Sequence, residues 1–334
     1  MVLGFVDASR RFRARCLVGA AIALAAMFAA LPSAPAQDYP SRPVKIIVPF
    51  PAGGTADVMP RIFAEWLSRK WGQPVIVENR TGAAGNIGAE AAFKSEPDGY
   101  TLLSAPPPPL VINQNLYPKL GFDPTEFIPI IIMGRVPNAL VVNPKVAANA
   151  VAELIAYAKA NPGKLTSATQ GNGTTSHLTS ELFQLMAQVK VQHVPYRGSA
   201  PALTDLVAGS VDIMFDNLGV SLALVKAGQL KLLAVATPKR MASLPDVPTM
   251  AETLPGFESA AWFAVVAPPK TPAAIVSKIN ADMNEALRQS EVVARLGQLS
   301  AEPIGGTPQA TAGYMREEVT RWHNVIKSAG VKLE

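Results

Sequence analysis

The sequence is poor in the side chains that most often bind metals or act as nucleophiles. Its 334 residues include one cysteine, Cys16, and three histidines, His177, His193 and His323. Cys16 lies in an apolar run near the N-terminus, so the chain beyond residue 36 has no thiol for a disulfide, for covalent catalysis or for a thiolate metal site. The histidines lack the spacing of a metal-binding motif. We therefore predict no metal site and no disulfide.

Charged residues are also scarce, at 16% of the chain, and the 30 basic and 25 acidic residues give a net charge of +5. Four of the basic residues and one acidic residue lie in residues 1–36, so the rest of the chain carries 26 basic and 24 acidic residues, a net of +2. It has no cluster of Lys and Arg of the kind that binds phosphates. Nucleic acid is therefore not an expected partner.

The N-terminus has the order of features found in secretory signals. Four arginines precede an apolar run over residues 16–31, which is short for a membrane span of ~20 residues, and Ala34-Pro35-Ala36 follows as a small-residue cleavage site. We predict cleavage after Ala36 and a periplasmic, monomeric mature protein. An uncleaved membrane anchor is the alternative.

From residue 44 onward, short β-branched runs alternate with amphipathic segments of helical length, which is the pattern of parallel α/β units. We expect strands at 44–48, 75–77, 101–104, 128–133, 139–142, 166–168, 192–194, 213–215, 232–236 and 261–266. We expect helices at 56–70, 86–94, 151–161, 175–188, 200–209, 220–227, 272–289, 292–298 and 308–328.

Two segments, 138–144 and 258–269, have the features of crossovers between lobes. A chain that leaves one lobe through the first and returns through the second forms two lobes joined by a double hinge. We expect residues 37–138 plus 258–334 in lobe 1 and residues 139–257 in lobe 2. Ligand sites in such folds lie between the lobes, at the carboxyl ends of strands.

Two glycine-rich turns lead from a predicted strand into a predicted helix. Gly53 and Gly54 allow close backbone approach in the first, and Gly171 and Gly173 do so in the second. Each helix start offers unpaired N–H groups, so each turn can hold an anion. A molecule with an acidic group at each end would suit the two turns. Simple helix capping explains them as well, by Thr55 or Asp57 in the first and by Thr174 or Ser176 in the second.

Two further segments are candidates for the site. In residues 194–201, Ser199 can begin a helix and Tyr196 can line a cleft, while we expect the side chain of Arg197 in solvent. Asp216 ends a predicted strand, where a polar side chain can orient a ligand.

Several enzyme classes are disfavoured. The first turn lacks the Lys-Ser/Thr ending of a phosphate-binding loop for nucleoside triphosphates, and residues 82–88 lack the surroundings of a dinucleotide site. The chain has no G-x-S-x-G motif. An exported hydrolase would need a nucleophile or an acid–base pair that the sequence does not supply. We predict a protein that is not an enzyme and that needs no cofactor.

Segments 39–45, 49–57, 75–88, 97–103, 171–177 and 194–198, together with Pro201, resemble the Bug (TctC-like) extracytoplasmic solute receptors of tripartite tricarboxylate transporters. The resemblance covers residues 38–334. It implies a periplasmic-binding-protein fold whose two lobes close on a small organic acid, and a membrane permease as partner. A ligand-sensing subunit for a histidine kinase is the alternative, since both roles use the same closure.

The resemblance also implies that the loops matching 50–57 and 169–177 hold carboxylates through backbone amides and ordered water. The site residues that it implies are Phe50, Gly53, Gly54, Thr55, Asp57, Gly171, Gly173, Thr174, Thr175 and His177, followed by Tyr196, Gly198, Ser199 and Asp216. Ser104 and Ala105, at the end of the third strand, complete the set.

After Ala105 this chain departs from the family and has four prolines, 106–109, where relatives commonly carry Gly, Ser or Thr. Four prolines remove four N–H donors and favour a stiff, extended polyproline wall. We therefore expect a ligand with an apolar middle, such as an aromatic or medium-chain dicarboxylate, rather than citrate. Stiffening of an exposed loop outside the cleft is the alternative role.

Overall fold

The computed structural model describes residues 39–331, and the chain divides into two compact units, Met1–Ser41 and Arg42–Glu334. The predicted signal segment, residues 1–36, belongs to the first unit and lies outside the described residues. All elements below belong to the second unit. No helix within residues 39–331 is both long enough and apolar enough to cross a membrane.

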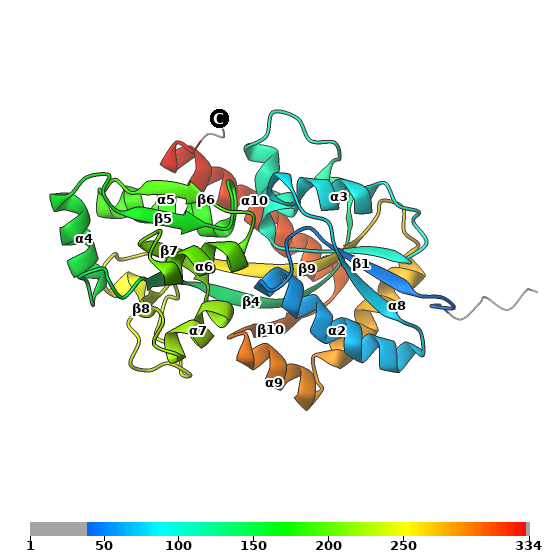
Figure 1. Ribbon diagram of the computed structural model, residues 1–334. Coiled ribbons are helices and arrows are strands. Elements are labelled where there is room, and N and C mark those ends of the chain that lie inside the picture. Colours follow the sequence, from blue (N-terminus) through cyan, green and yellow to red (C-terminus); the bar gives the residue numbers. More distant parts are fainter. Residues whose placement is uncertain (1–38, 332–334) are drawn as a thin grey trace, which may run out of the picture. The chain divides into compact units, whose positions relative to one another are not determined.

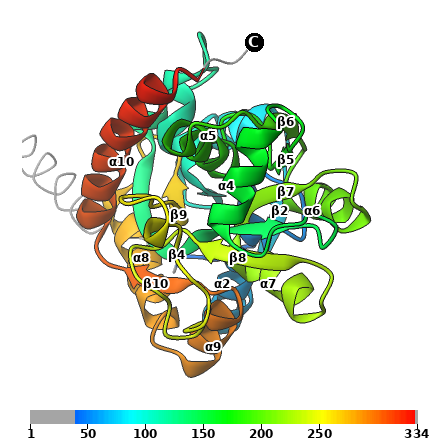
Figure 2. The same cartoon turned by 90° about the vertical axis from the view of Figure 1, so that its left-hand side faces the viewer.

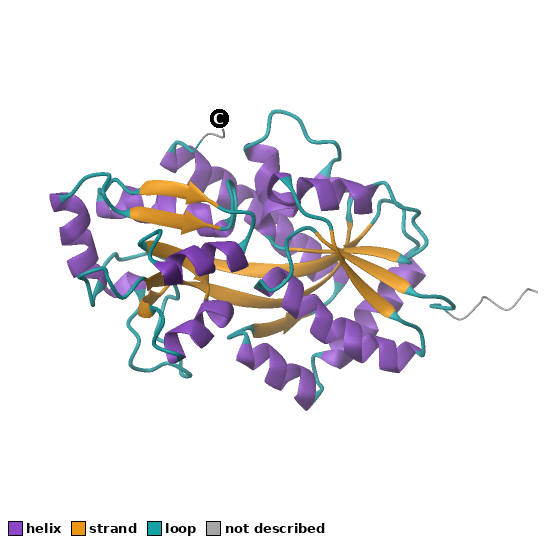
Figure 3. Ribbon diagram, in the orientation of Figure 1, coloured by secondary structure: helices purple, strands orange, loops and turns teal. Residues whose placement is uncertain are grey.

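The second unit is built on one ten-stranded mixed sheet (Figures 1 and 3). Strands β1, β2 and β3 pair in parallel, as do β5, β6 and β7; we call these groups the β1–β3 half and the β5–β7 half. The antiparallel strands β4 and β9 join the halves, in the order β2-β1-β3-β9-β4-β7-β5-β6. Strands β8 and β10 both pair with β4. The strands are β1 (Val44–Val48), β2 (Val75–Asn79), β3 (Thr101–Ala105), β4 (Ile128–Val142), β5 (Thr166–Thr169), β6 (Gln192–Pro195), β7 (Ile213–Asn217), β8 (Lys231–Val235), β9 (Ala260–Ala267) and β10 (Glu302–Gly305).

Helices flank the sheet, and most follow directly after a strand. Helix α2 packs on β2, α8 and α9, because its buried residues Met59, Ile62, Phe63 and Leu67 recur at helical spacing. Helix α10 packs on β4 and on α5 of the β5–β7 half (Figure 2). The helices are α2 (Thr55–Trp71), α3 (Asn86–Phe93), α4 (Val151–Ala160), α5 (Thr175–Ala187), α6 (Ser199–Ala208), α7 (Leu218–Lys226), α8 (Ala273–Ala286), α9 (Ser290–Gln298) and α10 (Pro308–Ala329).

Each predicted helix and strand is present, with three corrections. The segments 128–133 and 139–142 form one strand, β4, because the pairing of residues 134–137 with β9 keeps the chain extended between them. Strand β10 was not predicted, since it has four residues and only Gly305 is buried. The sheet is mixed rather than parallel, because β4 and β9 run against their neighbours.

The two predicted crossovers lie side by side. The amide of Asn138 donates to the carbonyl of Ser259 (3.1 Å), where β4 and the segment leading into β9 pass between the halves. The buried side chain of Asn138 also donates to Thr179 Oγ1 (3.0 Å) and Ser259 Oγ (2.8 Å). This buried network ties both crossing segments to α5. The lobe boundaries 37–138 plus 258–334 and 139–257 stay a prediction.

The expectation of an extended polyproline wall is wrong. Pro107 has helical backbone angles, φ −49° and ψ −36°, and Pro108–Ile112 continue as a helical turn. Proline fits the first turn of a helix, since its ring holds φ at a helical value and the amides there have no intrahelical partner. The run still lacks four N–H donors.

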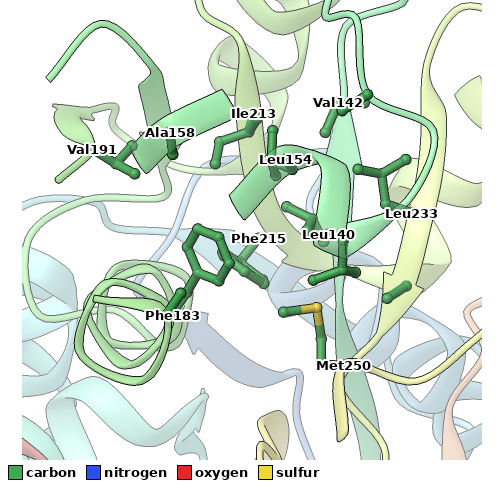
Figure 4. Close-up of a cluster of buried hydrophobic side chains, with 14 of the residues drawn as sticks. Leu140, Val142, Leu154, Ala158, Phe183, Val191, Ile213, Phe215, Leu233 and Met250 are labelled. Carbon is green, nitrogen blue, oxygen red and sulfur yellow. The ribbon is translucent and has the colours of Figure 1, made fainter. Parts of the chain in front are cut away.

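Each half has its own apolar core. In the β5–β7 half, Phe183, Phe215 and Phe257 are fully buried, with neighbouring ring centroids 5.6 and 5.9 Å apart, and they pack with Leu140 and Met250 (Figure 4). A separate cluster around Leu103, Trp262 and Trp322 serves the β1–β3 half. Burying one such large side chain contributes roughly 1.5–3 kcal/mol. Each half is therefore held together by its own contacts.

Candidate ligand-binding site

A narrow cleft lies between the two halves. It contains about 420 Å³ of empty space. Its walls come from the β1–α2 loop, the proline run, the loops after β5 and β6, the end of β7, and β9. The lining residues are Phe50, Pro51, Gly54, Thr55, Ala56, Pro106, Pro108, Gln170, Thr174, Thr175, Gly198, Ser199, Asn217, Ala261 and Phe263.

Four helices begin at this cleft, because residues of their first turns or N-caps line it: α2, α5, α6 and α7. The N-caps of α2, α6 and α7 are Gly54, Gly198 and Asn217, and none of them caps its helix with a side chain. In α5 the hydroxyl of Thr174 accepts a hydrogen bond from the amide of His177 (3.3 Å). Uncapped first-turn amides and the positive ends of helix dipoles favour anions. The cleft is therefore suited to a ligand with negative groups, because helix starts from both halves can bind them.

In the β1–α2 loop, the buried carboxylate of Asp57 organises the backbone. It accepts hydrogen bonds from the amide of Gly53 (3.1 Å), Arg61 Nε (2.9 Å) and Asn79 Nδ2 (2.9 Å), and Asn79 also donates to the carbonyl of Phe50 (2.9 Å). Burial acts to raise the pKa of Asp57, but these hydrogen bonds outweigh it and hold the pKa below the usual 3.8. Asp57 therefore stays ionised, and its hydrogen bonds hold the backbone of the β1–α2 loop in place.

The adjacent hydroxyl of Thr55 is different. Thr55 lines the cleft and is only 2% exposed, yet its Oγ1 has no hydrogen-bond partner. A buried hydroxyl without a partner costs roughly 1–3 kcal/mol. A ligand acceptor in the cleft would supply the missing partner.

The loop after β5 is held by a pair of histidines. The amide of Gly173 donates to His177 Nδ1 (3.1 Å), the His177 ring stacks on His193 with centroids 4.2 Å apart, and His193 Nε2 lies 2.6 Å from Thr169 Oγ1. Burial, and then the nearby His193, lower the pKa of His177 to about 3. His177 is therefore neutral at pH 7, as its role as acceptor requires.

Asp216 lies at the end of β7, behind the residues of the β5–β7 half that line the cleft, which we call the β5–β7 wall. It is fully buried. Its Oδ1 accepts hydrogen bonds from Gln170 Nε2 (2.7 Å) and from the hydroxyl of Ser199, while Oδ2 has no partner. Burial raises the pKa of Asp216 to about 6, against the opposing effect of the Ser199 and Gln170 hydrogen bonds. The two donors are themselves part of the cleft lining.

Positive charge is missing from the cleft: none of its lining residues within the described chain is Lys, Arg or His. A second cavity, with about 840 Å³ of empty space, shares Phe50, Pro51 and Gln170 with the cleft, and Arg197 is exposed there. Within residues 39–331, no three His, Cys, Asp or Glu side chains lie close enough to hold a metal ion.

Of the sixteen site residues expected from the sequence, seven line the cleft: Phe50, Gly54, Thr55, Thr174, Thr175, Gly198 and Ser199. Gly171 and Tyr196 line the second cavity instead. The other seven are in neither lining: Gly53, Asp57, Ser104, Ala105, Gly173, His177 and Asp216. Their part in binding stays a prediction, although Gly53, Asp57, Gly173 and His177 shape the loops that carry the lining residues.

Some lining residues were not among the predicted sixteen. Gln170 follows β5 directly, and Asn217 is the N-cap of α7. Ala261 and Phe263 are alternate residues of β9, a strand buried at every position, so its sequence does not distinguish the face toward the cleft. Pro106 and Pro108 do line the cleft, as the leading reading of the proline run expects.

A sequence model of the tripartite tricarboxylate transporter family receptor, TctC, matches residues 59–331. The chain belongs to this receptor family. BugT of Bordetella pertussis is 41% identical over 302 residues, which cover 90% of this chain and 93% of BugT. The family assignment made from the motifs is thereby confirmed.

Solved structures of other receptors agree. Rpa4515 of R. palustris, determined with adipate, superposes with a TM-score of 0.86 at 41% identity, covering 88% of this chain and 99% of that one. MatC (Rpa3494) of Rhodopseudomonas palustris, with bound malate, has a TM-score of 0.82 at 33% identity, covering 86% and 100%. The predicted fold of a two-lobed periplasmic binding protein is confirmed, and TctC proteins are periplasmic solute receptors.

Proposed function

We propose that this TctC receptor binds an aliphatic dicarboxylate of about the size of adipate in the cleft between its halves and delivers it to the membrane subunits of a tripartite transporter. The observation that carries the proposal is the arrangement of helix starts. The uncapped starts of α2, α6 and α7 come from both halves and meet at one cleft. A molecule with a carboxylate at each end can use donors of both halves at once.

The rest of the lining supports an apolar ligand body. Phe50, Pro106, Pro108, Ala261 and Phe263 supply apolar surface to the lining of the cleft. The prolines have no N–H to offer, so a hydroxyl-rich acid would lose water there without gaining a partner. Each such unpaired group costs roughly 1–3 kcal/mol, which is enough to favour adipate over citrate.

The ligands of related receptors support the chemical class. Rpa4515, at 41% identity, was determined with adipate, and MatC, at 33%, with malate. Both are dicarboxylates, and adipate has the longer unsubstituted chain. The apolar lining favours the adipate-like case for this chain.

Isothermal titration calorimetry with the exported protein tests the proposal. We expect adipate to bind more tightly than malate or citrate. Thr55→Val should weaken adipate binding about tenfold or more, because the hydroxyl's hydrogen bond to a carboxylate contributes about 1.5–3 kcal/mol. Thr311→Val is the matched control: Thr311 is also buried with an unpartnered hydroxyl, but it lies on α10, outside the cleft. Equal effects of the two changes, or no binding of any dicarboxylate, would contradict the proposal.

Export is part of the same proposal. We propose cleavage after Ala36, so that the mature receptor begins at Gln37 and acts as a monomer in the periplasm. Mass spectrometry of the periplasmic protein reads its N-terminus directly, and size-exclusion chromatography with light scattering reads its mass. A retained segment 1–36, or a stable dimer, would require a different account of export or assembly.

A further inference from the structure

We propose that Asp216 takes up a proton when a dicarboxylate enters the cleft, so that Ser199 can turn its hydroxyl hydrogen from Asp216 to the ligand. This inference rests on the proposed function and adds to it a positioning residue and a coupling between ligand and proton. Asp216 does not line the cleft and acts through Ser199 and Gln170, which do.

The hydrogen-bond inventory of Ser199 carries the argument. A hydroxyl has one hydrogen to donate, and Ser199 donates it to Asp216 Oδ1. While Asp216 is ionised, Ser199 therefore presents only lone pairs to the cleft, although it begins helix α6 and lies where a carboxylate would be held. A carboxylate cannot donate, so the two groups would face each other as acceptors.

Protonation of Asp216 removes this conflict. The carboxylic acid can donate to Ser199 Oγ, and the hydroxyl hydrogen of Ser199 then becomes available to the ligand. The proton comes from solvent, and no covalent bond to the ligand forms. The Oδ1 atom can still accept the hydrogen bond from Gln170.

Electrostatics point in the same direction. Asp216 is 0% exposed, Oδ2 has no partner, and a ligand would bring further negative charge into a cleft whose described lining has no Lys, Arg or His. A like charge at short range in a water-poor site raises the pKa of a carboxyl group. Since burial already raises the pKa of Asp216 to about 6, a further rise on binding carries it above neutral pH, so that Asp216 is mostly protonated at pH 7 in the complex.

The ionisable groups on the surrounding elements are engaged elsewhere. On β4, Arg135 pairs with Glu258. On α6, Asp205 accepts a hydrogen bond from Tyr196 Oη (2.7 Å). On β8, Lys231 donates to the carbonyls of Val146 and Ala148 (2.7 Å each).

The ionisable groups on the other neighbouring helices and on β6 also have partners or lie at a distance. His177 on α5 and His193 on β6 stack on each other, and Asp57 on α2 pairs with Arg61. Lys226 lies at the far end of α7. The two hydrogen-bond donors to Asp216, Ser199 and Gln170, are uncharged groups.

The test is calorimetric titration of adipate at pH 7 in two buffers that differ in heat of protonation, because the difference in apparent enthalpy gives the protons taken up per ligand. We expect an uptake approaching one proton for the native receptor, and an affinity that falls by at most about tenfold per pH unit as pH rises. Asp216→Asn cannot take up this proton, so its adipate affinity should be constant with pH. Asp282→Asn is the control, since Asp282 is also buried but bonds Trp71 on α2, away from the cleft.

The outcomes separate this inference from the proposed function. Adipate binding without proton uptake, or with equal uptake in Asp216→Asn, overturns the inference and leaves the function intact, whereas absence of adipate binding overturns the function. Infrared difference spectra of the native receptor with ¹³C-adipate keep the test independent of the variant's folding. A new protonated-carboxyl band that the isotope does not shift supports the inference, because it comes from a carboxyl group of the protein. A band that shifts with the isotope, or no band, overturns the inference.

Discussion

The two walls of the cleft each have a buried carboxylate behind them, and the two carboxylates are held in opposite ways. Asp57, behind the β1–α2 wall, accepts hydrogen bonds from Arg61, Asn79 and a backbone amide, and its pKa lies below the usual value. Asp216, behind the β5–β7 wall, has no cationic partner and one oxygen without any partner, and its pKa is raised to about 6. Burial alone therefore does not decide the charge of a carboxyl group; its donors do.

This difference assigns different work to the two walls. The Asp57 network fixes the shape of the Phe50–Thr55 turn at every pH above the acid range. The Asp216 site leaves its charge, and with it the hydrogen bond of Ser199, open to change at pH 6–7. The hydrogen bonds of the first wall therefore stay the same when a ligand binds, whereas those of the second wall change with the charge of Asp216.

The largest effect on stability is expected from removing the fixed carboxylate. Asp57→Ala should lower the free energy of unfolding by about 2–3 kcal/mol, because Gly53 N and Asn79 lose their acceptor; the half-exposed Arg61 contributes less. Glu65→Ala, which removes exposed ion pairs to Arg69 and Arg295, should cost below about 1 kcal/mol. Urea unfolding compares the two, and equal losses would mean that the Asp57 network is not a structural support.

Asp216→Asn should have the opposite sign and raise the free energy of unfolding at pH 8 by about 1–3 kcal/mol. The folded-state pKa of about 6 lies above the usual 3.8, so the native carboxylate's penalty is absent below pH 3.8, grows up to pH 6 and is complete above it. The gain should therefore shrink as pH falls toward 4. A variant that is less stable than the native protein at pH 8 would show that Asp216 is held as firmly as Asp57.

The contact between the walls predicts a change of about tenfold in affinity. A Cβ on Gly198 would lie 3.0 Å from Pro51 Cδ across the cleft, and φ at Gly198 is +129°. Gly198→Ala should strain the backbone and press the walls apart, weakening adipate binding about tenfold, or roughly 1.4 kcal/mol. Gly228→Ala has a positive φ of +71° with open space around the Cβ, so it should lower stability and leave affinity unchanged. Calorimetry on both variants checks this.

The smallest effect is expected at Arg197, the exposed cation of the adjoining cavity. Arg197→Ala should slow adipate association a few-fold at low ionic strength and hardly at all at high ionic strength, since a surface charge acts mainly by steering. Lys159→Ala, on the exposed face of α4, is the control. Stopped-flow measurements at two salt concentrations give the association rate of each variant. A reduction in rate that does not depend on salt would instead place Arg197 in direct contact with the ligand.

Much of this fold could be predicted because its signals are local. The run Val44–Val48 followed by Gly53, Gly54 and an amphipathic segment predicts strand, turn and helix within a short window, and the turns at Gly171 and Gly198 follow the same rule. The continuity of β4 through Gly134 and Pro137 could not be predicted, because it depends on pairing with β9, more than a hundred residues away.

In the candidate site too, local features could be predicted from the sequence and features that depend on tertiary pairing could not. The turns before α2, α5 and α6 were predicted, whereas Ala261 and Phe263 reach the cleft only through tertiary pairing of β9. The proline run was placed correctly at the cleft but with the wrong backbone, since proline's φ fits both an extended chain and a first helical turn, and only the surroundings choose between them. The opposite pKa shifts of Asp57 and Asp216 also depend on the assembled fold: the hydrogen bond from Asn79, distant in sequence, helps to lower the pKa of Asp57, and burial raises the pKa of Asp216.

The central claim is that donors of both halves, without a cationic side chain, hold a dicarboxylate in this cleft. A crystal structure of the receptor with adipate tests it most directly. We predict one carboxylate within hydrogen-bond distance of the Thr55 hydroxyl and the first-turn amides of α2, and the other at the starts of α5, α6 or α7, with no Lys, Arg or His within ion-pair distance of either. Adipate bound in the adjoining cavity with a carboxylate paired to Arg197 would contradict the claim.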